Sequence, residues 1–260
     1  MDAIVIAGHT PGKIDALLEY AGAENKAFIP IAGKPMIQWV IDALAGSRHV
    51  DRLCVVGLDE SCGIDFGPKP VLFVPDQGRL TKNLWIGAQR ILPDTPDRDH
   101  ILVCACDIPL ITTAIVDDHI AMMLATPHDL YYTIVDRATM LARFPASRRT
   151  YTHVRDGAFC GGDLNMASSK VIETNKELWD DLLEARKSAL RQAMRVGVWT
   201  LFQLATRTLS IAAAERRAEK ILGVKCRAVH TPHAEIGMDV DKPFQLDIVR
   251  AELEKKTNDR

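Results

Sequence analysis

Cysteine pairs of the kind that bind zinc or form redox motifs are missing from this sequence. No two cysteines stand three positions apart, and several lie inside apolar runs, where a free thiol packs as a small hydrophobic group. We therefore expect reduced thiols rather than a zinc site at the six positions Cys54, Cys62, Cys104, Cys106, Cys160 and Cys226.

An excess of charge of one sign is missing as well. The 32 basic and 34 acidic residues are spread along the chain and leave a formal net charge of -2, which disfavours binding to nucleic acid. No run approaches the ~18 apolar residues of a membrane span. The N-terminus places Asp2 beside a short apolar segment, unlike a signal peptide. We expect a cytoplasmic protein without a membrane or nucleic-acid partner.

Short apolar runs alternate with helix-length intervals in the first half of the chain. Four runs of strand length are apolar on both faces, which is typical of a parallel sheet covered by helices. They are Ala3–Ala7, Leu53–Gly57, Val71–Val74 and Ile101–Ala105. Apolar residues at helical spacing occupy Pro35–Ala45 and Leu84–Leu92 between them. This alternation predicts a doubly wound α/β fold.

The second half mixes strands with longer helical patterns. Strands are expected at Leu130–Val135, Tyr151–Val154 and Lys225–Val229, and helices at Lys176–Leu209, Ala212–Leu222 and about Pro243–Lys255. The apolar stripe of the first of these helical patterns suits either the core or a subunit contact, so a homodimer is one interpretation. We predict one α/β domain over residues 1–260, built on a single, mostly parallel mixed sheet, with a helical insertion at about 176–222.

The stretch IVIAGHTPGK at the N-terminus ends a buried strand in glycine and reaches a lysine. Such a loop either brings backbone N–H groups to an anion or makes an ordinary turn into a helix. It is not a Walker A motif, because three residues separate Gly8 from Gly12 and Ile14 follows Lys13. Nor does it contain the three glycines of a dinucleotide-binding fingerprint.

Two charged residues stand where packing does not require them. Lys26 precedes the short apolar segment AFIPI, and Asp107 follows the apolar strand of ILVCACDIPLI. Ligands of open parallel sheets bind outside the carboxyl ends of the strands, so Asp107 is expected to face a crevice. The alternative is that Asp107 caps the next helix, but Thr112 and Thr113 are there to do so.

A second acidic motif, GMDVDKP, precedes the last helix. Alternation along an extended segment would place Asp239 and Asp241 on one face, and paired carboxylates suit a hard cation. Asp241 alone could also be the N-cap of the helix. Helix capping therefore accounts for one of the two acids and leaves the other unexplained.

Together these motifs resemble the nucleotidyltransferases of GT-A-like fold, which include molybdenum-cofactor guanylyltransferase and the cytidylyltransferases of sugar acids and methylerythritol phosphate. The resemblance rests on NKAFIPIAGKPMIQWVIDAL, DRLCVVG, VCACDIPLIT, GGDLNMAS and EIGMDVDKPFQL. It implies transfer of a nucleoside monophosphate from a nucleoside triphosphate (NTP) to a small phosphorylated acceptor, with Mg²⁺ or Mn²⁺ as cofactor and release of pyrophosphate.

The resemblance also implies a role for each matching residue. Lys26 would contact phosphate, and Asp107 would hold the metal with the acids of the DVD motif, Asp241 foremost and Asp239 beside it. Catalysis would depend on Lys13, Lys26 and Asp107. The loop that cradles the triphosphate would comprise Ala7, Gly8, His9, Thr10, Gly12 and Lys13, with Asn83 at the nucleoside and Gly161, Gly162 and Asn165 at the acceptor.

Two departures from the family pattern lie in the opening loop. His9 stands where a second glycine is usual, and Lys13 stands where arginine is usual. Lysine keeps the positive charge but lacks the bidentate fork of a guanidinium, which changes how the loop can hold a phosphate.

Three other functions are compatible with parts of the sequence. The loop departures would suit a nucleotide-binding or regulatory protein that has lost turnover. A GT-A glycosyltransferase would need a D-x-D motif at a strand end, where ACDIP offers one acid. A nicotinamide or flavin dehydrogenase would find a ribose-binding acid in Glu24, but its glycine fingerprint is missing.

Overall fold

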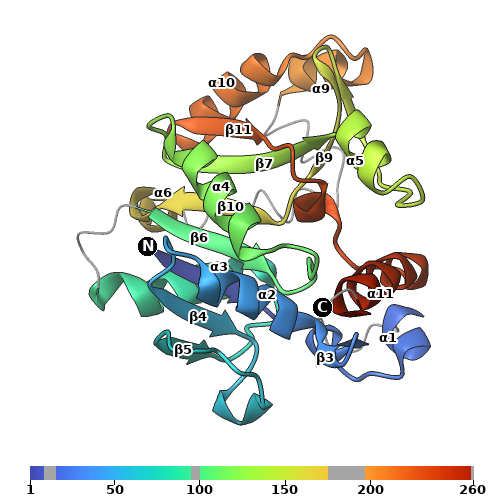
Figure 1. Cartoon of the computed structure of the whole chain (residues 1–260). Coiled ribbons are helices and arrows are strands. Elements are labelled where there is room, and N and C mark those ends of the chain that lie inside the picture. The colour runs from blue at the N-terminus through green and yellow to red at the C-terminus, as the bar shows by residue number, and fades with distance from the viewer. Residues whose placement is uncertain (9–15, 95–99, 175–196, 259–260) are drawn as a thin grey trace.

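In the part of the chain that the structure describes, β2 (Pro30–Ile31) and β3 (Lys34–Pro35) pair as a small two-stranded sheet, and the other nine strands form one mixed sheet (Figure 1). The structure is a computed structural model and describes residues 1–8, 16–94, 100–174 and 197–258. The strands of the mixed sheet are β1 (Asp2–Ile6), β4 (Arg52–Val56), β5 (Val71–Val74), β6 (His100–Ala105), β7 (Leu130–Asp136), β8 (Thr152–Val154), β9 (Gly157–Gly161), β10 (Leu164–Ser168) and β11 (Cys226–His230). Their order is β5-β4-β1-β6-β10-β7-β9-β8, and β11 pairs with β7.

The parallel half of this sheet consists of β5, β4, β1 and β6, as the apolar runs predict. Ile6 at the end of β1 is level with Val56 of β4 and with Ala105 of β6. The carboxyl ends of these strands therefore meet along one border of the sheet, which we call the carboxyl edge. Gly57 and Asp107, which follow β4 and β6, lie along it.

The other half of the sheet is less parallel than the sequence suggests. β10 runs antiparallel to both β6 and β7, β9 is antiparallel to β7 and β8, and only β11 is parallel to its neighbour. The predicted α/β fold with a mixed sheet is confirmed, but parallel pairing dominates only its first half. The sequence analysis missed β9 and β10, because both strands are short and glycines at 161 and 162 interrupt their apolar pattern.

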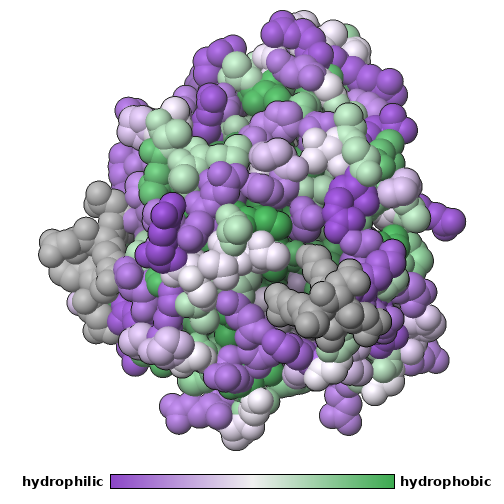
Figure 2. All heavy atoms as spheres, viewed as in Figure 1, coloured by the Kyte–Doolittle hydropathy of each residue, from purple (hydrophilic) through white to green (hydrophobic). Residues whose placement is uncertain are grey.

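Helices cover both faces of the parallel half. α2 (Met36–Gly46) and α4 (Thr113–Leu124) pack on the face toward the viewer in Figure 1, and α3 (Leu80–Ile91) packs on the opposite face. The apolar spacing of α2 buries Ile37, Val40 and Ile41 completely. Figure 2 shows the outer side of α2 and α4 as hydrophilic residues with scattered apolar ones. The Thr112 side chain caps α4, which leaves Asp107 without a capping role.

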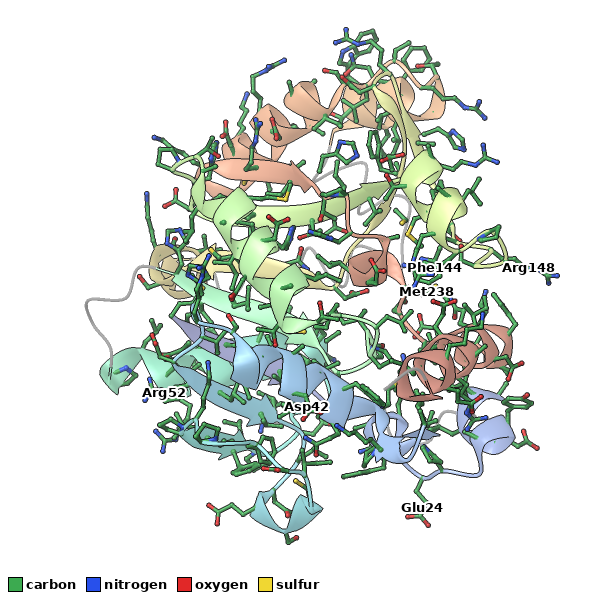
Figure 3. The ribbon with its side chains drawn as sticks, in the orientation of Figure 1. Glu24, Asp42, Arg52, Phe144, Arg148 and Met238 are labelled. Atoms are coloured by element: carbon green, nitrogen blue, oxygen red, sulfur yellow. The ribbon has the colours of Figure 1, made fainter. Side chains whose placement is uncertain are left out.

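The last helix returns to the first part of the chain. α11 (Pro243–Asn258) lies beside α1 (Ala16–Ala21) in Figure 1, and the hydroxyl of Tyr20 donates to Asp247 over 2.9 Å. A core cluster beneath α11 includes Phe144 and Met238, which lie close together in Figure 3.

The remaining elements are η1 (Lys26–Phe28), η2 (Glu60–Cys62), η3 (Leu92–Asp94), α5 (Arg137–Arg143), α6 (Ser169–Thr174) and η4 (Ala234–Gly237).

The helical insertion expected at about 176–222 lies partly outside the described residues. Inside them, α10 (Ile211–Leu222) matches the predicted helix, whereas α9 (Val198–Ala205) begins after Gly197, which has a φ of +90°, and ends before the predicted Leu209. α10 ends at Gly223, which has a φ of +70° and donates its N–H to Glu219, as a helix C-terminus requires. Each described helix is too short or too polar to span a lipid bilayer.

Gly57 has a tightly restricted place at the carboxyl edge. Its φ is +103°, and a Cβ there would lie 2.5 Å from the nitrogen of Gly8. We predict that Gly57→Ala lowers the free energy of unfolding by about 2–4 kcal/mol, because a strained φ adds to a clash with backbone. Urea unfolding measures the change.

Gly63→Ala is the matched control for this prediction. Gly63 also has a positive φ, +72°, but nothing lies within 4 Å of its Cβ position. The control should lose only the ~1–2 kcal/mol that a left-handed residue costs. Equal losses in the two variants would show that the close approach to Gly8 is unimportant.

Candidate active site

Three charged side chains meet at the carboxyl edge. The Lys26 ammonium lies 2.5 Å from Oδ2 of Asp107 and 2.5 Å from Oδ1 of Asp241. Lys26 belongs to η1, Asp107 follows β6, and Asp241 precedes α11. The structure thus brings together the lysine and two of the acids that the sequence analysis selected, from three distant segments. We call this group the Lys26 cluster.

Backbone hydrogen bonds hold the segments of the Lys26 cluster in place. The N–H of Val240 donates to the carbonyl of Asp107 over 2.9 Å, which fixes the segment before α11 against the end of β6. Lys26 begins a short 3-10 helix whose N-cap, Asn25, accepts the N–H of Ala27 over 2.9 Å. Main-chain hydrogen bonds therefore help to position the three charged side chains, in addition to the contacts among the side chains themselves.

The charges of the cluster stabilise one another. Burial disfavours a charged lysine, but the charges of Asp107 and Asp241 outweigh it and raise the pKa of Lys26. Burial would likewise raise the pKa of Asp241, but the charge of Lys26 and its hydrogen bond lower it. Lys26 and Asp241 therefore both carry charge at neutral pH.

Asp163 and Arg149 stand next to this cluster, and the sequence analysis missed both. Arg149 forms an ion pair with Asp239. Burial raises the pKa of Asp163 to about 7, and the charge of Asp107 acts in the same direction. Asp163 lies at the carboxyl edge because its carbonyl accepts the N–H of Ala105. The sequence does contain a signal for Asp163, because this acid lies between Gly162 and Asn165, which were both predicted to meet the acceptor.

The opening loop is described only as far as Gly8. A Cβ at Gly8 would lie 2.7 Å from side-chain atoms of both Asn83 and Asp76, so only glycine fits there. Asn83 is buried, donates to Asp76 over 2.8 Å and accepts the N–H of Gln77 over 2.7 Å. The structure thus places Gly8 beside Asn83. Ala7 is buried, and the remaining predicted loop residues, His9, Thr10, Gly12 and Lys13, lie outside the described residues.

The residues predicted to meet the acceptor line a cavity of about 550 Å³. Gly161, Gly162 and Asn165 form part of its wall, together with Arg149 and Asp239. The cavity begins beside the carboxyl edge and extends over the sheet face that α3 covers in part. It is therefore in reach of the Lys26 cluster.

The cluster fits a divalent cation. Asp107 and Asp241 already point at one cationic group, the Lys26 ammonium, and Oδ1 of Asp107 is buried with no hydrogen-bond partner among the described residues. Mg²⁺ is commonly bound by one or two carboxylates, with substrate phosphates and water completing its shell. Asp239 is turned to Arg149 instead. No three His, Cys, Asp or Glu side chains in the described ranges form a metal cage by themselves.

Lys26→Met tests the charge balance of the cluster. We predict a loss of about 1–3 kcal/mol in the free energy of unfolding at pH 7, because two carboxylates lose their cation. The lowered pKa of Asp241 means that its stabilisation is present above the ordinary aspartate pKa and is lost as the pH falls through the folded value. The deficit of the variant should therefore shrink below about pH 4.

Lys34→Met provides the control in the same urea titrations. Lys34 pairs with Asp42 over 2.6 Å, but both side chains are more than 40% exposed, so its removal should cost less than about 1 kcal/mol. A Lys26→Met variant as stable as this control at pH 7 would contradict the proposed charge balance.

Comparisons with known proteins give a family match and several similar structures. A family model described as the MobA-like NTP transferase domain matches residues 19–195. A structure titled as a hypothetical transferase from Thermus thermophilus is 34% identical, with a TM-score of 0.79, and the match covers 94% of this chain and 98% of that one.

Two further structures share the fold at low identity. CMP:2-keto-3-deoxy-manno-octonic acid synthetase complexed with CTP is 15% identical, with a TM-score of 0.56 over 98% of this chain and 100% of that one. The 4-diphosphocytidyl-2C-methyl-D-erythritol synthase of Anaerococcus prevotii is 10% identical, with a TM-score of 0.56 over 97% and 95%. No curated protein matches the sequence. The resemblance inferred from the motifs is confirmed, and the chain belongs to the family of the MobA-like NTP transferase domain.

Proposed function

We propose that the protein is a Mg²⁺-dependent nucleotidyltransferase that moves a nucleoside monophosphate from an NTP to a small phosphorylated acceptor. The observation that carries this proposal is the pair of carboxylates, Asp107 and Asp241, aimed at one cationic group at the carboxyl edge. Membership of an NTP transferase family supports an NTP as the substrate.

In this reaction the protein mainly has to position the two reactants and neutralise their negative charge. An anionic oxygen of the acceptor attacks the α-phosphorus of the NTP, a new P–O bond forms, and the bond from the α-phosphorus to the bridging oxygen of pyrophosphate breaks. A phosphate acceptor already carries its negative oxygen, so no proton has to be removed. Alignment of the two reactants therefore contributes most of what the site must supply.

Each part of the site has a task in this reaction. Asp107 and Asp241 would hold the metal ion, which when bound neutralises charge on the phosphates. The Lys26 ammonium would donate hydrogen bonds to phosphate oxygens, and backbone N–H groups from Gly8 onward would line the triphosphate. Lys13, His9, Thr10 and Gly12 would complete that loop.

A pyrophosphate assay tests the proposal directly. The protein is incubated with each of the four common NTPs, Mg²⁺ and a panel of small phosphorylated metabolites, and pyrophosphate is measured. At least one pairing should release pyrophosphate in proportion to enzyme. Release with no pairing, together with measurable NTP binding, would favour a nucleotide-binding protein without turnover.

With an active pairing in hand, Asp107→Asn should lower turnover by about 100-fold or more. The amide keeps the size of the side chain but removes the charge that would hold the metal, a loss of about 3 kcal/mol in transition-state stabilisation. Circular dichroism and urea unfolding should show a folded variant.

Asp42→Asn is the matched control. Asp42, labelled in Figure 3, also pairs with a lysine, Lys34, but it lies on α2 and is not part of the Lys26 cluster. Its turnover should remain within about twofold of the wild type. Equal activity of the Asp107 and Asp42 variants would remove Asp107 from the mechanism.

A further inference from the structure

The cavity beside the Lys26 cluster has an unusual lining for a site that receives a small phosphorylated metabolite. Its volume of about 550 Å³ is typical of pockets that enclose a small molecule. Ile4 and Ile6 of β1 line it, whereas Ala3 and Val5 face the core beneath α2 and α4. The cavity therefore lies on the opposite face of the sheet, between α3 and α6.

The floor of the cavity consists of three rows of side chains at increasing distance from the carboxyl edge. The sheet register gives a first row of Ile6, Ala105 and Asp163, a second row of Ile4, Val103 and Asn165, and a third row of Ala167 and Leu130. Successive rows are two residues apart, so at about 3.3 Å per residue the floor extends about 13 Å. Leu84 and Trp85 of α3, Tyr132 of β7 and Val171 of α6 add walls.

Charged groups gather at one end of this floor. Arg149, Asp163 and Asp239 lie at the carboxyl edge, next to the Lys26 cluster. Lys82, an exposed lining residue, is in the first turn of α3, which follows the carboxyl end of β5 and so begins at the same edge. Beyond the first row, the described lining is mostly hydrocarbon.

Asn165 is the polar side chain of the second row, and the main chain already uses it. Its Oδ1 accepts the N–H of Thr133 over 2.8 Å, and its Nδ2 donates to the carbonyl of Gly162 over 3.0 Å. A hydroxylated ligand lying on this floor would give up hydrogen bonds to water and regain few, which is costly. A hydrocarbon ligand would gain from the same surface.

We infer that this cavity is the acceptor site of the proposed reaction and takes an amphiphilic phosphate rather than a sugar phosphate. The anionic head lies at the Arg149 and Lys82 end, in reach of the Lys26 cluster, and an aliphatic body extends along the apolar floor. The role of this ligand as the acceptor rests on the proposed function. The binding of an amphiphile depends on the cavity alone.

A series of straight-chain alkyl phosphates with four, six, eight and ten carbons tests the inference. Each is titrated below its micellar concentration, and the dissociation constant is measured by calorimetry and by tryptophan fluorescence, since Trp85 lines the cavity. Affinity should rise about fourfold per added methylene, equivalent to about 0.8 kcal/mol each, until the floor is covered. Affinity that does not change with chain length would overturn the inference.

The substitution Val103→Phe tests whether the alkyl chain binds in this cavity. Val103 is half-buried in the middle row, so a larger side chain would occupy the cavity. The variant should bind the ten-carbon phosphate at least tenfold more weakly and lose the dependence on chain length. Val103→Thr, nearly equal in size to valine but polar, should weaken binding severalfold and serves if the phenylalanine variant does not fold.

Val198→Phe is the matched control, because Val198 is exposed on α9 and does not line the cavity. It should bind the whole series as the wild type does. Loss of binding in this control equal to that in Val103→Phe would also count against the assigned site.

The pyrophosphate assay separates this inference from the proposed function. Release with sugar phosphates, but neither binding nor release with alkyl phosphates, would keep the reaction and overturn the amphiphilic acceptor. Binding that depends on chain length, without pyrophosphate from any NTP, would support the amphiphile site and remove the reaction. Release that rises with chain length would support both.

Discussion

A single ammonium group balances the negative charge of the candidate site. Lys26 stands between carboxylates that come from positions 81 and 215 residues away, and both contacts are 2.5 Å long. Without this cation, two acids and the neighbouring Asp163 would face each other across a partly buried edge, which is unfavourable. The lysine keeps the site assembled before any ligand arrives.

Much of this arrangement could be predicted from the sequence because its causes are local. The apolar run before Asp107 predicts a buried parallel strand, and the position of Asp107 after it predicts that this acid lies at the carboxyl edge. The DVD motif alternates as expected, since Met238 and Val240 are fully buried, whereas Asp239 and Asp241 form ion pairs. Asp163 escaped prediction because pairing among β7, β9 and β10 brings it to the edge, and short strands interrupted by glycine carry little pattern. Arg149, the partner of Asp239, escaped prediction because it lies in the segment between α5 and β8, far from Asp239 in the sequence.

The geometry also weighs on the alternative functions. In a glycosyltransferase with a D-x-D motif, both acids would be expected to serve one cation. Here Asp239 pairs with Arg149 while Asp241 pairs with Lys26, so the two acids of the DVD motif serve different partners. The proposed metal, held by Asp107 and Asp241 from two different segments, would suit phosphoryl chemistry between two anionic reactants. In the proposed reaction, the apolar floor of the neighbouring cavity would limit which acceptor binds.

The hydrogen bond between Val240 and Asp107 has a consequence for how the protein is made. Lys26 and Asp107 leave the ribosome long before the segment that carries Asp241, which follows Lys26 by 215 positions. During synthesis the parallel strands can pair, but the nascent chain holds only half of its acidic pair. The site is therefore completed only after this last of the three segments has been made and α11 docks against α1. A ribosome-bound intermediate would have the fold of the sheet and no finished place for a cation.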